Sequence, residues 1–334
     1  MVERVGRGVG AAVTAAPVRG ARGRVPGVGR RGWALAVVAV GLAGVLAFPA
    51  LVPNWPGRMG SLVESFLPWA GVGVVLSLVV AVVRRSGVAL VALLLPVAAW
   101  VQGFGGLLLP GAEAGGRELV VVQHNVSDEN RDPAGTARAL ARAEPDLIAL
   151  EELVQPALST YENVLGPDYP HHVVRGTVGL WSRHPLTDAR AVDIKPRGIT
   201  ESWSRGLRAV VHTPYGDVAA YVAHLPSVRL GAGGLASSLR DESAGLLGEA
   251  IEAEAVGPVL LLGDLNSTVD DRGLDPLTSQ LGVAERGFAL SFPAAFPLAR
   301  IDQVMARTAI VRDIRTLPAT GSDHLPVAAR VTLS

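Results

Sequence analysis

The sequence contains no cysteine. This absence excludes a disulfide framework, a metal site built from thiolates and a cysteine nucleophile. The sequence also lacks an excess of either charge, because its formal net charge is +0 and its pI is about 7.1. It therefore has no global basic field for nucleic acid, although a small nucleic-acid cleft stays compatible with this balance. We find no internal repeat, and 334 residues are enough for two domains.

The first third of the chain has long stretches without any charged side chain. These apolar runs cover residues 33–52, 67–83 and 88–109, and tryptophans lie at or near their ends. A soluble core helix would show a polar face, and these runs show none. Their lengths approach the number of residues needed to cross a bilayer. We therefore expect three transmembrane helices that span a lipid bilayer. A cleavable signal peptide is the alternative for the first run.

Charge around these runs predicts their orientation. Residues 1–32 are rich in arginine, contain one acid, Glu3, and show no periodic apolar pattern, which favours a disordered basic tail. Such a tail could be a nucleic-acid arm, but a cytoplasmic flank of a membrane helix fits better. Arg84 and Arg85 separate the second and third runs. The positive-inside rule then places the N-terminus in the cytoplasm and the C-terminal domain of this cell-membrane protein outside it.

After a linker at residues 111–116, the pattern changes to alternating strands and helices over residues 117–334. Residues 132–144 and 236–255 have helical spacing, and Asp132 followed by Pro133 is typical of a helix start. Seven further segments favour strands: 118–126, 146–153, 177–183, 207–214, 217–225, 300–306 and 325–333. A strand also precedes Asp264 in "PVLLLGDLN". This mixture predicts one layered α/β domain of ordinary size.

Polar side chains lie at the ends of these strands. They are Asn125, Glu151, Glu152, His224, Asp264, Asn266, Asp302, Asp323 and His324. Each has an ordinary structural explanation as a turn former, a solvated carboxylate or a structural histidine. Asp302 resists that explanation, because it lies between apolar residues and a buried carboxylate needs a partner, for which His324 is the natural candidate. Together the set offers metal ligands, an acid–base histidine and phosphate-binding donors.

The segment "LLLGDLN" illustrates the argument. Asp264 and Asn266 lie two residues apart, so an extended chain would direct both side chains to the same side. Gly263 beside them would let another backbone approach closely. We expect Glu152, His224 and His324 to converge on that side.

Seven ordered blocks resemble the endonuclease/exonuclease/phosphatase superfamily, which includes deoxyribonuclease I, AP endonucleases and neutral sphingomyelinases. The blocks are "VVVQHNV", "PDLIALEEL", "GLWSRHPL", "YVAHLPS", "LLLGDLNST", "RIDQVMA" and "GSDHLPV". The resemblance covers residues 117–334 and implies a four-layered α/β sandwich with the site at one edge of two packed sheets. It also implies a Mg²⁺ or Mn²⁺ cofactor. Membrane-anchored bacterial members of the superfamily have similar N-terminal spans.

The resemblance assigns roles to individual residues. Glu152 becomes the principal metal ligand, with Asn125 and Asp323, whereas Glu151 takes the place of a glutamine. His224 and Asn266 hold phosphate oxygens, and His224 protonates the leaving group. Either Asp264 or His324, which Asp302 orients, activates the water. The implied reaction is metal-assisted hydrolysis of a phosphoester.

The sequence indicates the class of reaction more closely than it indicates the substrate. We find neither the inserted loops with which AP endonucleases grip DNA nor the substrate motifs of inositol phosphatases. A nuclease-like phosphodiesterase acting on nucleic acid is the leading hypothesis, with a lipid-headgroup phosphodiesterase, a phosphomonoesterase and an inactive membrane scaffold as alternatives. A metalloprotease is disfavoured, because no H-E-x-x-H segment occurs. Side chains that could face the substrate are Arg183, Arg205, Arg208, His171 and His172.

Overall fold

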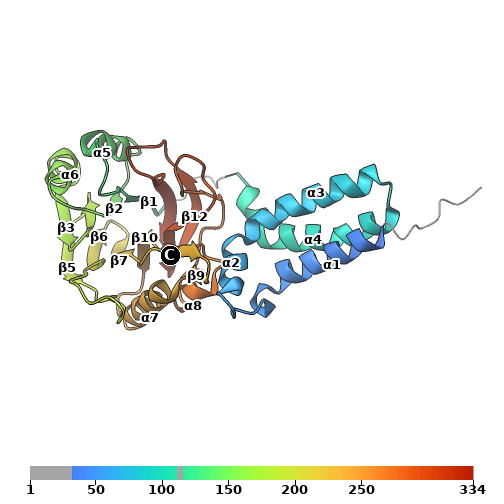
Figure 1. Cartoon of the computed structure of the whole chain (residues 1–334). Coiled ribbons are helices and arrows are strands. Elements are labelled where there is room, and N and C mark those ends of the chain that lie inside the picture. The colour runs from blue at the N-terminus through green and yellow to red at the C-terminus, as the bar shows by residue number, and fades with distance from the viewer. Residues whose placement is uncertain (1–31, 111–115, 334) are drawn as a thin grey trace, which may run out of the picture.

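The computed structural model describes residues 32–110 and 116–333. It shows an α/β domain from which a bundle of helices projects (Figure 1). The predicted basic tail and the predicted linker fall almost entirely outside the described ranges, so both stay predictions.

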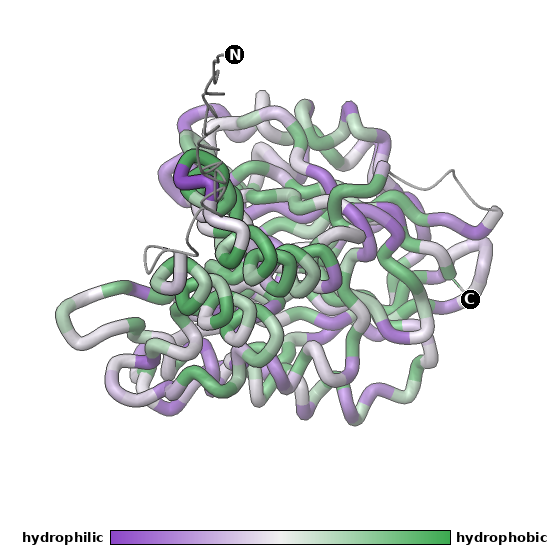
Figure 2. The backbone as a smooth tube through the Cα atoms, turned by 90° about the vertical axis from the view of Figure 1, so that its right-hand side faces the viewer, coloured by the Kyte–Doolittle hydropathy of each residue, from purple (hydrophilic) through white to green (hydrophobic). Residues whose placement is uncertain are grey.

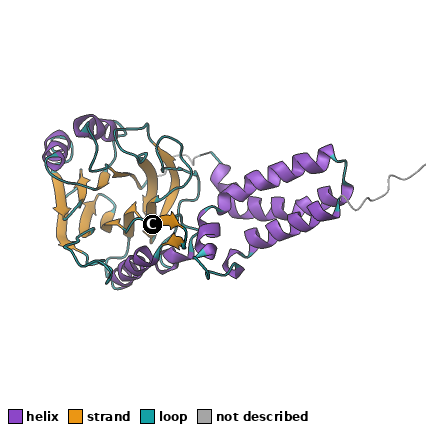
Figure 3. Cartoon of the chain, in the orientation of Figure 1, coloured by secondary structure: helices purple, strands orange, loops and turns teal. Residues whose placement is uncertain are grey.

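Two β-sheets form the centre of the α/β domain (Figure 3). The first sheet has the strand order β12 (Ala309–Thr316), β13 (Val327–Leu333), β1 (Glu118–Asn125), β2 (Leu147–Glu151), β4 (Val178–Ser182) and β3 (His171–Arg175). The second has the order β11 (Asp302–Arg307), β10 (Val259–Asp264), β7 (Gly216–His224), β6 (Gly206–Thr213) and β5 (Leu186–Ala191). The pairs β1–β2 and β7–β10 are parallel, so both sheets place carboxyl ends of neighbouring strands side by side.

Helices cover the outer face of each sheet. The helices α5 (Pro133–Ala141) and α6 (Ala157–Leu165) share an apolar cluster with the first sheet. The helices α7 (Ser238–Glu252) and α8 (Asp275–Thr278) do the same for the second. A third cluster lies between the two sheets, which confirms the expected four-layered α/β sandwich. The expected helix start is also confirmed, because the side chain of Asp132 accepts a hydrogen bond from the backbone N–H of Gly135.

The cluster between the sheets changes from apolar to polar at one end. On β10, the inward positions are Leu260, Leu262 and then Asp264, because alternate residues of a strand share a face. Four other strands repeat this change at the same end of their inward rows, with Asn125 on β1, Glu151 on β2, His224 on β7 and Asp302 on β11. The candidate site is therefore the polar end of the inter-sheet core.

The helical module comprises residues 33–108, and its helices consist mostly of hydrophobic residues (green in Figure 2). Its helices are α1 (Trp33–Ala47), α2 (Met59–Ser65), α3 (Ala70–Val83) and α4 (Gly87–Phe104), with the short segments η1 (Pro49–Leu51), η2 (Leu67–Trp69) and η3 (Gly105–Leu108). Its exposed side chains include many valines and leucines. The large apolar residues of the α/β domain are mostly buried by comparison.

Three transmembrane helices are not supported. Of the described helices, one segment, Gly87–Leu108, is long and apolar enough to cross a membrane, with a mean hydropathy of 2.0. The helix α1 has 15 residues, which is about 22 Å against the ~30 Å of a bilayer core. It stops at Phe48 because the chain there leaves the helical conformation and Pro49 follows. The helices α2 and α3 form a second candidate only as a pair bent by 64°.

Polar contacts fasten the helical module to the α/β domain. The buried carboxylate of Glu64 in α2 accepts hydrogen bonds from Arg272 Nη2 at 2.6 Å and Arg272 Nε at 2.8 Å. Arg58 pairs with Asp241 of α7. The indole N–H of Trp69 donates to the carbonyl oxygen of Leu298 at 2.7 Å. The module therefore contacts the segments that follow β10 and precede β11.

Candidate active site

Strand register brings three predicted residues together. Asp264 lies opposite His224 of β7 on one side and opposite Asp302 of β11 on the other. Partners in register point to the same face of a sheet, here toward the first sheet. From that sheet, Asn125 Nδ2 donates to Asp264 Oδ2 at 3.1 Å. The prediction that these strand ends meet is thus confirmed.

Asp264 is the centre of the cluster. Its Oδ1 accepts the backbone N–H of Asn266 at 2.9 Å, and its Oδ2 lies 3.6 Å from His224 Nε2 and 3.8 Å from His324 Nε2. The side chain is almost completely buried. Burial raises the pKa of Asp264 to about 7, with the charge of His324 opposing the shift and that of Asp302 adding to it. A carboxylate with this pKa is suited to accept a proton near neutral pH.

Asp302 and His324 form the buried pair that the sequence predicted. His324 Nδ1 lies 2.8 Å from Asp302 Oδ2, and Gln123 Nε2 donates to the other carboxylate oxygen at 3.1 Å. Burial works against a charged His324, but the charge and hydrogen bond of Asp302 raise its pKa to about 10. His324 is therefore an imidazolium at neutral pH, with its second nitrogen directed toward Asp264. The ring of Phe292, 4.8 Å away between centroids, packs beside it.

Glu152 reaches the cluster by a turn of the backbone. It follows β2, and its φ of 59° lies in the left-handed region. Its Oε1 accepts from Asn125 Nδ2 at 3.1 Å, and its Oε2 accepts the backbone N–H of Asp128 at 3.2 Å. Its side chain is 30% exposed. Glu152 is therefore the carboxylate of the cluster that solvent, a cation or a substrate can reach.

Glu151 is the last residue of β2, directly before Glu152, and is fully buried. It accepts a hydrogen bond from Gln123 Nε2 at 2.7 Å. Burial and the nearby charges of Asp302 and Asp264 raise its pKa well above the ordinary value. Because burial disfavours the charged form of the enclosed Glu151, the structure agrees with the expectation that Glu152 is the ligand of the two.

His224 is buried beside Arg205, a residue that the sequence suggested only as one of five substrate-side candidates. Arg205 Nη1 lies 3.2 Å from His224 Nδ1, and the guanidinium packs 5.4 Å from the ring of Trp203. Burial, followed by the charge of Arg205, lowers the pKa of His224 to about 3. His224 is therefore neutral. Arg205 supplies a positive charge opposite Glu152 and Asp264, both of which favour its charged form.

Asn266 joins the cluster differently from the expectation. The strand ends at Asp264, and Asn266 has a φ of 49°, so the two side chains do not alternate along an extended chain. A turn returns the amide to the site, where its Nδ2 donates to the carbonyl oxygen of Leu225 at 2.9 Å and contacts Asp264 Oδ2 at 3.3 Å. The expected close approach at Gly263 is confirmed. A Cβ there would lie 1.9 Å from the carbonyl oxygen of Ala223.

Other predicted residues make no hydrogen bond to the cluster within residues 32–110 and 116–333, although the charge of Asp323 acts on His324. Asp323 is exposed, and its backbone carbonyl accepts from Ala294, whereas its carboxylate makes no hydrogen bond within the described part of the chain. Arg208 is buried in an ion pair with Glu254 and is structural. Arg183 packs on Tyr169, His171 lies on β3, and His172 stacks on Trp181.

The donors present suit a hard divalent cation. The carboxylates of Glu152 and Asp264 both lie against the amide of Asn125, so two acidic groups approach the same point. Oxygen donors of this type are those that Mg²⁺ and Mn²⁺ take in proteins. Asp264, Asp302 and His324 also offer three ligand atoms within 4.8 Å of one another. Because Asp302 is enclosed and bonded to His324, Glu152 and Asn125 are the better candidates.

Sequence reasoning missed several supporting residues. Ser322 Oγ donates to the carbonyl oxygen of Asn125 at 2.7 Å and accepts the N–H of His324, which links the last loop to β1. Ser291 lies against the N–H of Asp302, and Gln123 bridges Glu151 and Asp302. Gln123 had a sequence signal, because it is a polar residue that directly follows three valines in a predicted strand. Ser291 had none, because it meets Asp302 only through the path of its loop.

The fold and the cluster define a class of protein, a two-sheet α/β sandwich with a carboxylate–histidine centre at the end of the inter-sheet core. A model of the Endonuclease/Exonuclease/phosphatase family matches residues 122–324, which is more than half of the chain, and the chain belongs to this family. The family is one of phosphoesterases and nuclease-type hydrolases. No curated protein sequence matches the chain.

Solved structures agree in fold. An endonuclease/exonuclease/phosphatase from Beutenbergia cavernae is 19% identical, with a TM-score of 0.52 over 66% of this chain and 72% of that one. A humanized TDP2 of D. rerio is 17% identical, with a TM-score of 0.54 over 64% and 99% of the chains. A mannosyl-6-phosphatase from Bacteroides thetaiotaomicron is 16% identical, with a TM-score of 0.53 over 64% and 100%. At these identities the likeness concerns the fold alone.

Proposed function

We propose that the protein is a membrane-tethered, divalent-metal-dependent phosphodiesterase whose catalytic domain acts outside the cytoplasm. The observation that carries the hydrolytic part is the buried centre in which Asp264 lies between His224, His324 and Asn125. The arginine-rich flank and the apolar helical module support the membrane part. The charge rule described above supports the orientation.

A bound Mg²⁺ or Mn²⁺ would be held by Glu152 and Asn125, and would polarise the phosphate and stabilise the leaving oxygen. Around it, Arg205 offers donors for phosphate oxygens, whereas the amide N–H groups of Asn266 already contact Leu225 and Asp264. The imidazolium of His324, fixed by Asp302, offers a further charged donor. His224 stays neutral and buried, so we assign it to orienting Asp264 and Arg205 instead of protonating the leaving group.

Proton transfer then falls to Asp264 and His324. A water attacks phosphorus, Asp264 takes its proton, the bond between phosphorus and the leaving oxygen breaks, and His324 supplies a proton to that oxygen. Asp264 is the better base of the two, because its pKa is near 7 whereas His324 is already protonated. The sequence left open whether Asp264 or His324 activates the water, and we choose Asp264.

The test uses the full chain in detergent with Mg²⁺ and a generic phosphodiester, bis(p-nitrophenyl) phosphate. We expect Asp264→Asn and His324→Gln each to lower turnover by roughly 100-fold or more, the scale of general acid–base catalysis. The exposed Asp168→Asn serves as the control and should leave turnover unchanged. Folded variants with near wild-type turnover would contradict the assignment of the site.

Hydrolysis of a lipid headgroup is the second candidate, because the helical module contacts the loops around the site. Parallel assays with single-stranded DNA, RNA and phosphatidylcholine vesicles separate the two. Cleavage of nucleic acid supports the nuclease-like activity, and cleavage of the lipid alone supports the second candidate.

A further inference from the structure

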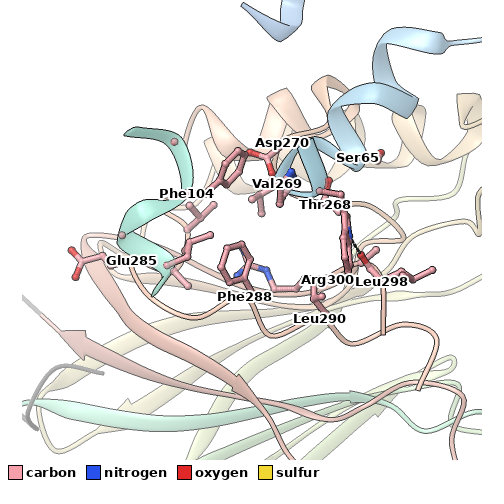
Figure 4. A pocket seen from close by; sticks show the side chains of 18 of the residues that line it. Ser65, Phe104, Thr268, Val269, Asp270, Glu285, Phe288, Leu290, Leu298 and Arg300 are labelled. Atoms are coloured by element: carbon pink, nitrogen blue, oxygen red, sulfur yellow. Dashed lines mark hydrogen bonds between the residues drawn. The ribbon is translucent and has the colours of Figure 1, made fainter. Parts of the chain in front are cut away.

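Two cavities lie side by side where the helical module meets the α/β domain. They share four wall residues, which are Pro68, Trp69, Phe288 and Leu290. One, here the α3–α4 groove, has a volume of about 530 Å³. The other, here the junction pocket, has a volume of about 240 Å³ and is drawn in Figure 4. Together they fall in the range of volumes that small-molecule sites occupy.

The walls of the α3–α4 groove are almost entirely apolar. They come from the beginning of α3 and the end of α4, which are the helix ends nearest the α/β domain, and include Val75, Leu76, Trp100 and Val101. The exposed apolar faces of the helical module continue from this groove. In water such a surface would carry a large free-energy cost, because removing apolar surface from water is favourable. An apolar chain in the groove would remove that cost.

The junction pocket ends in polar groups. Thr268, Val269 and Asp270 lie on one side of it, facing Phe288 and Leu290 (Figure 4). Thr268 is more than nine-tenths buried, and its enclosed Oγ1 has no hydrogen-bond partner among the described residues. Asp270 makes no hydrogen bond within the described ranges 32–110 and 116–333. Asp270 is only partly buried, so its carboxylate is the group of the pocket that can accept hydrogen bonds from a cationic part of a ligand.

The pocket also holds charges of both signs. Arg300 is buried, with its Nε donating to Gln303 Oε1 at 3.1 Å and its Nη1 to the carbonyl oxygen of Gly287 at 3.2 Å. It lies close enough to Asp270 for each charge to favour the other. A carboxylate and a guanidinium in one small pocket are complementary to a ligand that carries an ammonium and a phosphate.

We propose that the α3–α4 groove and the junction pocket together bind one zwitterionic phospholipid. One acyl chain lies in the groove, and the phosphate and amine of the headgroup lie near Arg300 and Asp270. The arrangement orients the lipid as in a bilayer leaflet, with its chain along the helices and its head at the α/β domain. A partner helix or a second copy of this chain could cover the groove, but neither would account for the polar end.

The site borders the catalytic loops without being part of them. Thr268 follows Asn266 by two residues, and Leu290 precedes Ser291, which lies against Asp302. Bound lipid would therefore hold both loops in place. This consequence is separate from hydrolysis, since binding is measured without any substrate turnover.

The test is native mass spectrometry of the full chain in detergent, titrated with dioleoyl phosphatidylethanolamine. We expect one lipid per chain, bound at least tenfold more weakly by Val75→Phe, which fills the groove. Val79→Phe is the matched control, because it lies one turn along α3, outside the groove, and is 54% exposed against 58% for Val75. Equal binding by the two variants, or no one-to-one complex with the wild type, would overturn the proposal.

The headgroup is tested with Asp270→Asn and with dioleoyl phosphatidylglycerol, which lacks the amine. We expect the wild type to prefer the phosphatidylethanolamine and the variant to lose this preference. A wild type that binds both lipids equally would refute the headgroup assignment. A mass of two chains without lipid that is lost in Val75→Phe and kept in Val79→Phe would identify the groove as a contact between copies and refute the lipid site as a whole.

Discussion

The α/β domain and the helical module are both rich in valine and leucine. The domain buries these side chains, whereas the module exposes many of them. In the domain, strands alternate and bury their apolar residues between two sheets, as with Leu262, which is 0% exposed. In the module, the helices carry apolar residues all round, and Leu94 is 65% exposed. The same composition thus forms a core in one region and an outer surface in the other. Each prediction below tests this difference.

The largest expected effect concerns the metal, which involves the α/β domain alone. Chelation with EDTA should lower phosphodiester turnover by roughly 100-fold or more, with recovery on addition of Mg²⁺ or Mn²⁺. The variant Glu152→Gln should need a higher metal concentration for half-maximal turnover. Activity that persists after chelation would argue against a metal-dependent reaction, and an unchanged metal requirement would argue against Glu152 as the ligand.

Truncation of one leucine in each region comes next. Leu262→Ala leaves a cavity between the sheets and should lower the free energy of unfolding by about 2–5 kcal/mol. Leu94→Ala removes an exposed side chain and should change stability in detergent by less than about 0.5 kcal/mol. Thermal or urea unfolding measures both. Equal losses would mean that Leu94 is covered in the protein as it exists in solution.

Glycine-to-alanine substitutions should also have opposite effects on stability in the two regions. Gly263→Ala should destabilise the α/β domain by about 1–3 kcal/mol or more, because its Cβ would meet the carbonyl oxygen of Ala223. In α1, a Cβ at Gly41 would meet no atom of the described residues within 4 Å, so Gly41→Ala should stabilise the helix by up to about 1 kcal/mol. A tolerated Gly263→Ala would show that β7 and β10 can separate at the site.

The last prediction concerns pH and involves the α/β domain, because α1, α3 and α4 contain no ionisable side chain. Although burial opposes it, hydrogen bonds from Arg208, the Val256 N–H and Tyr221 lower the pKa of Glu254 from 4.5 to about 2. The stabilisation is therefore complete above about pH 4.5 and is lost as the pH falls toward 2. Against Glu254→Gln, the wild type should lose an advantage on the order of 2 kcal/mol over this range. A pH-independent difference would contradict this account.

Much of the α/β domain could be predicted because its signals are local. Strand alternation and turn residues located β1, β2, β7 and β10 to within a few residues, and the ordered blocks gave the layers. The strands β3, β5 and β12 were missed, because their charged and half-exposed residues hide the alternation. In the module, apolar length indicated spans, but sequence hydropathy could not show that α1 ends before Phe48.

The site was predictable as a set of residues and less so as a geometry. A buried Asp302 demanded a partner, and His324 is that partner. The placement of Glu152 and Asn266 depends on left-handed backbone turns. The alternation of apolar and polar residues along a strand does not predict such turns. The role of Arg205 depends on its contact with His224, which arises because β6 lies beside β7. Such contacts follow from tertiary packing, and a single sequence carries little trace of them.

The bond between Glu64 and Arg272 has a consequence for how the enzyme meets its substrate. It ties the module to the segment just after the catalytic turn at Asn266, so the reaction centre cannot swing freely on a tether. With the helical module in a bilayer, as we propose, that centre would be kept at one height above the lipid surface. The search for a phosphoester would then be confined to a thin layer next to the membrane.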